Sequence, residues 1–304
     1  MSYQLLLNVG QQVHRAVPCS SSRPPAPDPL SLCQLNVTEP GSEISAEPEK
    51  QEPTDLSRMR SAVVFYILYV LCLVLGLACV VCVCVWNSHW YGGFAWSGSP
   101  LQFNWHPVLM VTGLVVLYGF GAVVYRIPLT WAQNKLPWKL LHAALMLLAL
   151  ILSIVGLRAV FEVHDAENIP RLYSVHSWVG ITATTFFAIQ WVMGVAGFLL
   201  PWSPMWLRKV LKPIHVLFGG SIITLSIIAS ISGINEKLIF SLGKAGGPQY
   251  KELPPEAIFG NSLGVLIVAF GLVVFMILSN PKWQRPDSIP GEMTYSPLIQ
   301  DDNE

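Results

Sequence analysis

Six long apolar segments follow one another along the chain, separated by short polar stretches. A helix needs about 20 apolar residues to cross the roughly 30 Å hydrocarbon core of a bilayer, and each segment is long enough. A membrane β-barrel would alternate apolar and polar positions, and these segments do not. The pattern predicts an all-α membrane protein with six antiparallel transmembrane helices. They are expected at about residues 61–86, 104–126, 138–161, 174–200, 211–232 and 257–279.

The composition agrees with a protein embedded in a lipid bilayer. Of its 304 residues, 53% are hydrophobic and 12% are charged, whereas a soluble domain carries about 25% charged residues. The formal net charge is zero, so nothing indicates binding to nucleic acid. Cys79 and Cys82 have the spacing of a C-x-x-C motif. Because no second pair accompanies them, we interpret them as small packing residues or a palmitoylation site rather than zinc ligands.

Both ends of the chain differ from this apolar part. Residues 1–58 are rich in Pro, Ser and Glu, a composition that cannot bury a core, so they are predicted to form a disordered tail. The tail lacks the basic and apolar regions of a cleaved signal peptide. The transmembrane domain is expected to cover residues 59–286, and residues 287–304 form a second short tail.

Lys and Arg residues are distributed unequally over the two sides of the predicted bundle. Ten of them flank segment ends on the side that carries both tails, and five lie on the other side. Positive charges accumulate on the cytosolic side of membrane proteins. Both termini are therefore expected in the cytosol, and the opposite side faces a lumen or the exterior.

Four histidines lie at the starts of four consecutive segments. His106 and His176 begin segments that enter from the luminal side, and His142 and His215 begin segments that enter from the cytosol. Ionisable side chains inside a membrane are costly and often functional. Two imidazoles at one depth can hold a haem iron from both sides and leave no open coordination position, which favours electron transfer. The alternative is that all four are interfacial histidines paired with headgroups or backbone.

The sequences around these histidines resemble the haem-ligand segments of the cytochrome b561 family. The matching stretches are Phe103–Met110, Leu140–Ala143, Leu172–Trp178 and Lys212–Val216. The resemblance extends from about residue 60 to about residue 286 and is strongest to the lysosomal ferric-reductase branch. It implies a central four-helix bundle with two b-type haems per chain, pairs His106 with His176 and His142 with His215, and implies a homodimer.

The resemblance also implies a binding site on each side of the membrane. Lys135, Lys139 and Arg208 match the family's cytosolic ascorbate-binding positions, and a basic cluster would attract this anion. His89 and His164 fall where the family handles its metal or ascorbate substrate on the luminal side, and imidazole can ligate iron. Each of the five could instead be a topology determinant or a solvated loop residue.

These features predict an oxidoreductase that carries electrons from cytosolic ascorbate through two bis-histidine haems to luminal ferric iron. One alternative keeps this path and regenerates luminal ascorbate from its radical. A second is a transporter that uses the histidines as a relay for metal ions or protons without haem. Residues Tyr295–Ile299 contain a tyrosine-based sorting signal. Together with the resemblance, this signal favours the membrane of the late endosome or lysosome.

Overall fold

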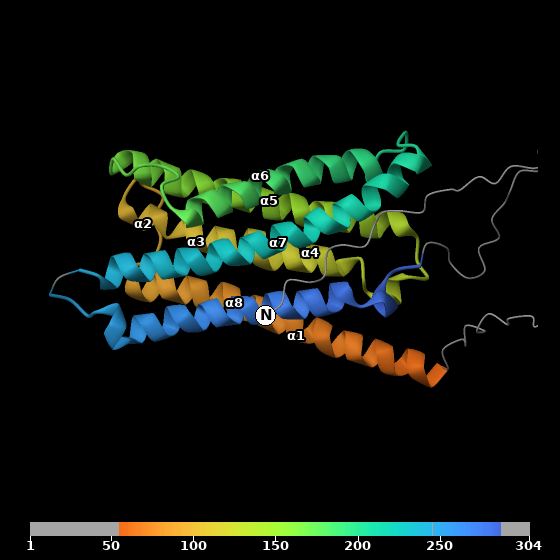
Figure 1. Ribbon diagram of the computed structural model, residues 1–304, viewed down its shortest axis with the longest axis horizontal. Coiled ribbons are helices and arrows are strands. Elements are labelled where there is room, and N and C mark those ends of the chain that lie inside the picture. Colours follow the sequence, from red (N-terminus) through yellow and green to blue (C-terminus); the bar gives the residue numbers. More distant parts are fainter. Residues whose placement is uncertain (1–54, 245, 287–304) are drawn as a thin grey trace, which may run out of the picture. The chain divides into compact units, whose positions relative to one another are not determined.

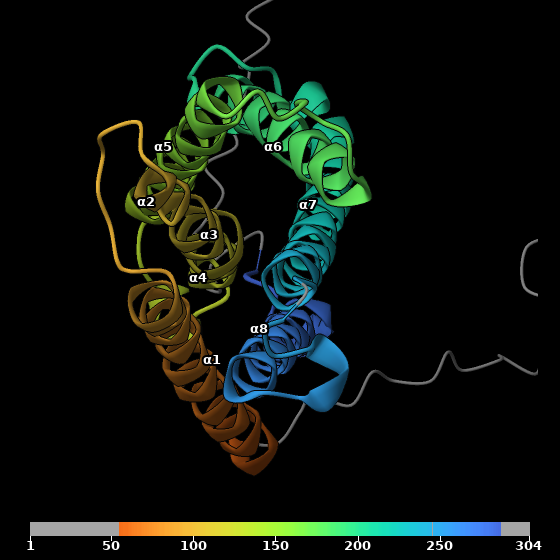
Figure 2. The ribbon, with the colours of Figure 1, turned by 90° about the vertical axis from the view of Figure 1, so that its left-hand side faces the viewer.

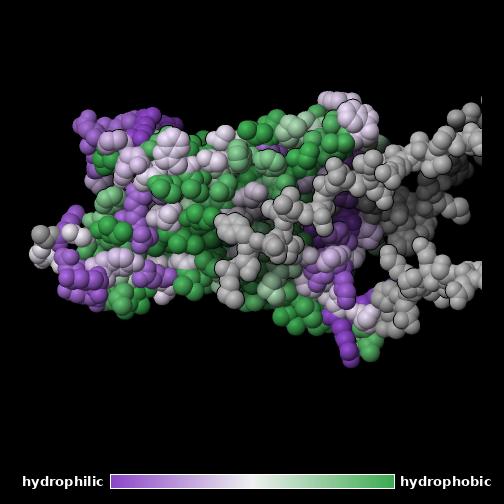
Figure 3. Space-filling view, viewed as in Figure 1, coloured by the Kyte–Doolittle hydropathy of each residue, from purple (hydrophilic) through white to green (hydrophobic). Residues whose placement is uncertain are grey.

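The computed structural model describes residues 55–244 and 246–286, and its long elements are all helices (Figure 1). Six helical segments are long and apolar enough to cross a membrane. The six spans are Asp55–Trp90, Pro100–Val124, Lys135–Ala166, Val175–Leu199, Met205–Leu242 and Pro255–Ser279. Apolar side chains cover the middle of the molecule and polar side chains gather at its two ends (Figure 3). The prediction of an all-α protein with six membrane-spanning helices is confirmed.

The spans form a closed ring when viewed from one end (Figure 2). Helix α1 (Asp55–Trp90) packs along α8 (Pro255–Ser279), so the first and last spans close the ring. Gly76 allows α1 to pack closely on both the second span and α8, since a Cβ there would lie 2.6 Å from the ring of Phe120 in the second span and 3.1 Å from that of Phe270 in α8. We call the end where α1 begins and α8 ends the terminal end, and the opposite end the far end.

The second span consists of several helical pieces in series. They are α2 (Pro100–Phe103), α3 (Trp105–Met110), the π-helical η1 (Val111–Leu117) and α4 (Tyr118–Val124). This span is the most buried of the six and contacts α1, α5, α7 and α8. Gly113 sets its approach to α5, because a Cβ there would lie 2.7 Å from the carbonyl oxygen of Ala149. π-Helical turns inside a helix are frequent at functional sites.

Two antiparallel hairpins make up the middle of the bundle. The first hairpin joins the second span to α5 (Lys135–Ala166). The second hairpin joins α6 (Val175–Gly194), with its π-helical end η3 (Val195–Leu199), to α7 (Met205–Leu242). Side chains cap two of the helices at their N-termini, where backbone N–H groups have no partner inside the helix: Asn134 accepts from Leu136 N at 3.1 Å, and Ser174 from Ser177 N at 3.3 Å. Short 3₁₀ turns follow α4, α7 and α8; they are η2 (Pro128–Thr130), η4 (Tyr250–Glu252) and η5 (Pro281–Trp283).

Several helices extend beyond their expected ends. Helix α7 runs from Met205 to Leu242 rather than from about 211 to 232, and α1 begins at Asp55, inside the stretch interpreted as a tail. An acidic residue in a first turn favours helix formation, because it faces the positive end of the helix dipole. Past residue 232, two polar side chains of α7 have partners at the far end. Glu236 accepts a hydrogen bond from Tyr173, and Lys237 lies over the rings of Tyr91 and Phe103. Residues 1–54 and 287–304, including the sorting signal at 295–299, lie outside the described residues.

Candidate functional site: two facing histidine pairs

The structure brings the four histidines together as two pairs, one near each end of the bundle. His106 on α3 faces His176 on α6, with ring centroids 6.0 Å apart and ring planes at 85°. His142 on α5 faces His215 on α7, with centroids 6.2 Å apart and planes at 68°. Each hairpin therefore contributes one histidine to each pair. The arrangement matches the pairing by depth that the sequence indicates.

A backbone carbonyl on the neighbouring helix of the same hairpin orients three of the four rings. His106 Nδ1 lies 3.1 Å from Gly156 O, and His142 Nδ1 lies 2.7 Å from Gly121 O. His176 Nδ1 lies 2.8 Å from the carbonyl oxygen of Ala229. A ring nitrogen that faces a carbonyl must donate, so the proton resides on Nδ1 and Nε2 keeps its lone pair. All three acceptors belong to Gly or Ala, whose small side chains leave room for the ring.

Two glycines lie close to imidazole rings, one at each histidine pair. A Cβ on Gly194 would lie 3.2 Å from Cε1 of His215. The carbonyl of His215 also accepts a hydrogen bond from Gln190 Nε2 at 2.5 Å. At the other pair, a Cβ on Gly233 would lie 2.6 Å from Cε1 of His176. Glycine is therefore required where α7 passes the His176 ring.

The facing rings suit a metal held from both sides. With metal–imidazole bonds of about 2 Å on each side, the centroids of two imidazoles that share one metal lie roughly 6 Å apart, as both pairs do. The Nδ1 hydrogen bonds to carbonyls are the usual outer support of metal-binding histidines. Among the residues that the structure describes, no third His, Cys, Asp or Glu joins either pair. Two facing imidazoles alone suit a flat macrocycle such as haem, which supplies its own remaining ligands.

Basic side chains cluster at the terminal end beside His215. Lys139 Nζ donates to the carbonyl of Phe198 at 3.3 Å, and the Phe198 ring lies 5.3 Å from that of His215. Arg208 Nη2 donates to the carbonyl of Leu200 at 3.1 Å, while its buried Nε has no hydrogen-bond partner. Lys139 also feels the charges of Arg208 and Lys135. The structure thus places Lys139 and Arg208 at the end of α6, with Lys135 one turn before Lys139 at the start of α5.

The two predicted luminal residues lie at the far end. His164, near the end of α5, has a buried Nδ1 without a hydrogen-bond partner and lies close enough to His106 for their charges to interact. His89 is exposed at the end of α1 and packs edge-to-face on Trp90. In the described part of the chain, no three His, Cys, Asp or Glu side chains form a group that could hold a metal ion. His164 is thus the better placed of the two beside the far-end pair.

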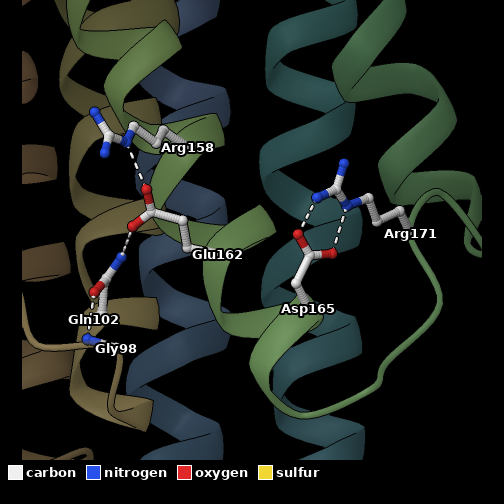
Figure 4. Close-up of polar contacts among 6 residues, drawn as sticks. All are labelled: Gly98, Gln102, Arg158, Glu162, Asp165 and Arg171. Atoms are coloured by element: carbon white, nitrogen blue, oxygen red, sulfur yellow. Dashed lines mark hydrogen bonds and ion pairs between the residues drawn. The ribbon is translucent and has the colours of Figure 1, made fainter.

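Hydrogen bonds and ion pairs stabilise the loops at the far end of the bundle (Figure 4). Buried Gln102, on α2, donates to Glu162 of α5 at 2.5 Å and accepts from the backbone N–H of Gly98 at 2.8 Å. Glu162 also pairs with Arg158, and Asp165 pairs with Arg171 of the α5–α6 loop. The hydrogen bond to Asp165 raises the pKa of Arg171. These contacts fix the segment that leads into His106.

Comparison with known proteins decides the family. The model of eukaryotic cytochrome b561 matches residues 105–241, a range that contains all four paired histidines. The lysosomal membrane ascorbate-dependent ferrireductase of Danio rerio is 59% identical over 245 residues, which cover 80% of this chain and 99% of that protein. The chain belongs to the cytochrome b561 family. The predicted resemblance is confirmed.

Two further relatives of this cytochrome b561 show the range of the similarity. The Homo sapiens lysosomal membrane ascorbate-dependent ferrireductase is 55% identical over 238 residues, covering 78% of this chain and 97% of its own. The Xenopus laevis plasma membrane ascorbate-dependent reductase is 45% identical over 232 residues, covering 76% and 81%. Membership of the family implies that this cytochrome b561 binds haem b, and the paired imidazoles fit that cofactor.

Arg126, one of the ten positive charges on the side that carries both tails, is a further candidate haem-binding residue. It follows α4 at the terminal end, and its buried Nη1 has no hydrogen-bond partner. Burial lowers the pKa of Arg126, because its charge is partly removed from water. A carboxylate such as those on the edge of haem b would satisfy this donor. Only the burial of the guanidinium distinguishes it from other basic residues, and a single sequence does not reveal burial.

Proposed function

We propose that this cytochrome b561 transfers electrons across a membrane from cytosolic ascorbate to luminal ferric iron. Each ascorbate gives up one electron and a proton to become its radical, and each ferric ion becomes ferrous. The observation that carries the proposal is the pair of facing histidines at each end of the bundle. The relatives named as ascorbate-dependent ferrireductases support the donor and the acceptor.

The histidine pairs would hold two b-type haems per chain. His106 and His176 would ligate the haem nearer the lumen, and His142 and His215 the haem nearer the cytosol. When bound, such bis-histidine haems supply reversible one-electron chemistry. The protein's part is to orient the imidazoles: in three of the four rings a carbonyl hydrogen bond holds the proton on Nδ1, which would leave Nε2 free to bind the iron.

Lys139 and Arg208 would bind ascorbate at the cytosolic end, with Lys135 adding to the positive field. Each cation uses one donor to cap a carbonyl at the end of α6, and a lysine has three donors and an arginine five. The remaining donors can hold the ascorbate oxygens. Phe198 contacts Lys139 through its carbonyl and His215 through its ring, so a bound ascorbate would be held near the cytosolic pair.

At the luminal end, His164 would help to bring ferric iron or ascorbate beside the His106–His176 pair, and His89 would serve the same substrates from the end of α1. We assign the terminal end to the cytosol, with both chain termini there, from the excess of positive charges around it. The names of the relatives and the sorting signal support a late endosomal or lysosomal membrane. A homodimer is expected from the family resemblance.

A vesicle assay tests the function directly. Purified protein is reconstituted with ascorbate enclosed on the cytosolic side, and a ferric chelate is offered outside with a ferrous-specific dye. We expect ferrous iron to form only when ascorbate is enclosed. No ferrous iron above protein-free vesicles would contradict the proposal.

The same vesicles separate this function from its two alternatives. Offering ascorbate radical in place of ferric iron measures the regeneration reaction, and faster consumption of the radical than of ferric iron would favour it. A histidine-relay transporter would instead move metal ions or protons without enclosed ascorbate. Because the electron path needs a donor, ion flux in vesicles lacking ascorbate would favour the transporter.

A further inference from the structure

One cation at the far end is enclosed by aromatic rings. Lys237 Nζ lies 4.2 Å from the centroid of the Tyr91 ring and 4.4 Å from that of Phe103. Lys237 belongs to the part of α7 that extends past the expected helix end. The faces of aromatic rings attract an ammonium group and shield it from water. The charge of Lys237 is therefore held at a fixed place rather than solvated freely.

This fixed charge lies at the same end of the bundle as both histidines of the far-end pair, and one aromatic ring separates it from His106. The Phe103 ring that contacts Lys237 lies 6.0 Å from the His106 ring, centroid to centroid. The distance from Lys237 Nζ to the centroid of the His106 ring is therefore at most the sum of the Lys237–Phe103 and Phe103–His106 distances. Gly233, one helical turn before Lys237, is the residue that packs against His176. The Phe103 ring therefore links Lys237 to His106, and Gly233 on the same helix as Lys237 contacts His176.

Glu256 and Glu167 both attract this charge, and Lys244 repels it. The Tyr91 hydroxyl donates to the Glu256 carboxylate, and Ser241 Oγ donates to the same carboxylate at 3.4 Å. Burial, followed by the hydrogen bond to Glu256, raises the pKa of Tyr91, so the phenol stays neutral and adds no negative charge. The cation lies next to Phe103, and the anion lies behind Tyr91 at the start of α8.

We infer that Lys237 is a positioning residue whose fixed charge favours the reduced state of the haem held by His106 and His176. This inference rests on the proposed function. Reduction adds one electron to the site, and a nearby cation stabilises the added negative charge. The interaction is strong because the cation is enclosed and poorly screened by water and salt. Lys237 would thus draw electrons toward the luminal end, whereas Glu256 opposes it.

Redox titration of purified, haem-loaded protein tests the inference. The absorbance of each haem is followed against potential, and the luminal haem is identified as the component missing from His176→Ala. We expect Lys237→Met to lower the potential of the luminal haem while leaving that of the cytosolic haem unchanged, and Lys237→Arg to restore it. Glu256→Gln should shift the luminal haem in the opposite direction.

The outcomes separate this inference from the proposed function. An unchanged luminal potential in Lys237→Met, or equal shifts of both haems, would overturn the role of Lys237 and leave the haem assignment intact. Wild-type protein without two haem components would instead overturn the proposed function. If Lys237→Met fails to fold with haem, Glu256→Gln decides, because an upward shift confined to the luminal haem supports the field and no shift refutes it.

Discussion

Gly233 on α7 lies against the imidazole of His176 on α6, and a Cβ at this glycine would approach within 2.6 Å of Cε1 and 2.8 Å of Nδ1. The same ring donates from Nδ1 to Ala229, one turn earlier on α7. The helix thus contacts one edge of the ring at two positions that are one turn apart. Any side chain at position 233 would displace the ring from this carbonyl.

Gly233→Ala is therefore expected to disturb the luminal pair. Overpacking a tight contact costs about 1–3 kcal/mol, and here the strain falls on a ligand ring. The absorption of one haem should weaken or be lost, while the other remains. Gly264→Ala is the matched control, because nothing lies within 4 Å of a Cβ at that glycine in α8. Equal spectra for both variants would contradict the tight contact.

Removing a cation at the terminal end should weaken ascorbate use without loss of haem. Lys139→Gln and Arg208→Gln each remove a charge-assisted donor, worth about 1.5–3 kcal/mol. The KM for ascorbate should rise on the order of tenfold or more, and the rise should shrink at high salt. Initial rates of haem reduction against ascorbate concentration give the measurement.

The neighbouring exposed Lys209 provides the control for this site. Lys209→Gln removes the same charge from the same side of the membrane, yet the Lys209 side chain is exposed to solvent, whereas that of Arg208 is held against the end of α6. A KM shift as large as that of Arg208→Gln would mean that general surface charge, rather than this site, attracts ascorbate.

Gln102 should matter for stability at the far end. It is buried, and it joins α2 to α5 through Glu162 and to the preceding loop through Gly98 (Figure 4). Gln102→Ala removes the hydrogen bonds of a buried side chain to Glu162 and Gly98, one of them to a charged group, which costs about 1–3 kcal/mol. Thermal unfolding in detergent should show a lower midpoint. Arg158→Ala breaks only an exposed ion pair with Glu162 and should change the midpoint little.

The number of spans and the pairing of the histidines follow from the sequence. The length of each apolar segment and the position of each histidine at a segment start can be read from the sequence. Because consecutive helices are antiparallel, these positions give the depth of each histidine in the membrane. His106 and His176 therefore had to lie at one depth, and His142 and His215 at another. The structure adds that the partners come from different hairpins.

Other features of the site depend on which side chains meet across helices, and a single sequence does not contain that information. The carbonyls of Gly156, Gly121 and Ala229 could not be identified as imidazole acceptors, because any small residue in a helix looks alike. In the sequence Lys237 is only one of the five positive charges expected on the luminal side. Its role depends on Tyr91 and Phe103, which come from distant parts of the chain.

The most direct test of the two histidine pairs is haem content and ascorbate reduction measured by visible difference spectra. Purified wild-type protein should contain two b-type haems per chain, both reducible by ascorbate. His106→Ala and His176→Ala should each lose the same component, and His142→Ala and His215→Ala the other. One haem per chain, or loss of the same component from all four variants, would contradict the account.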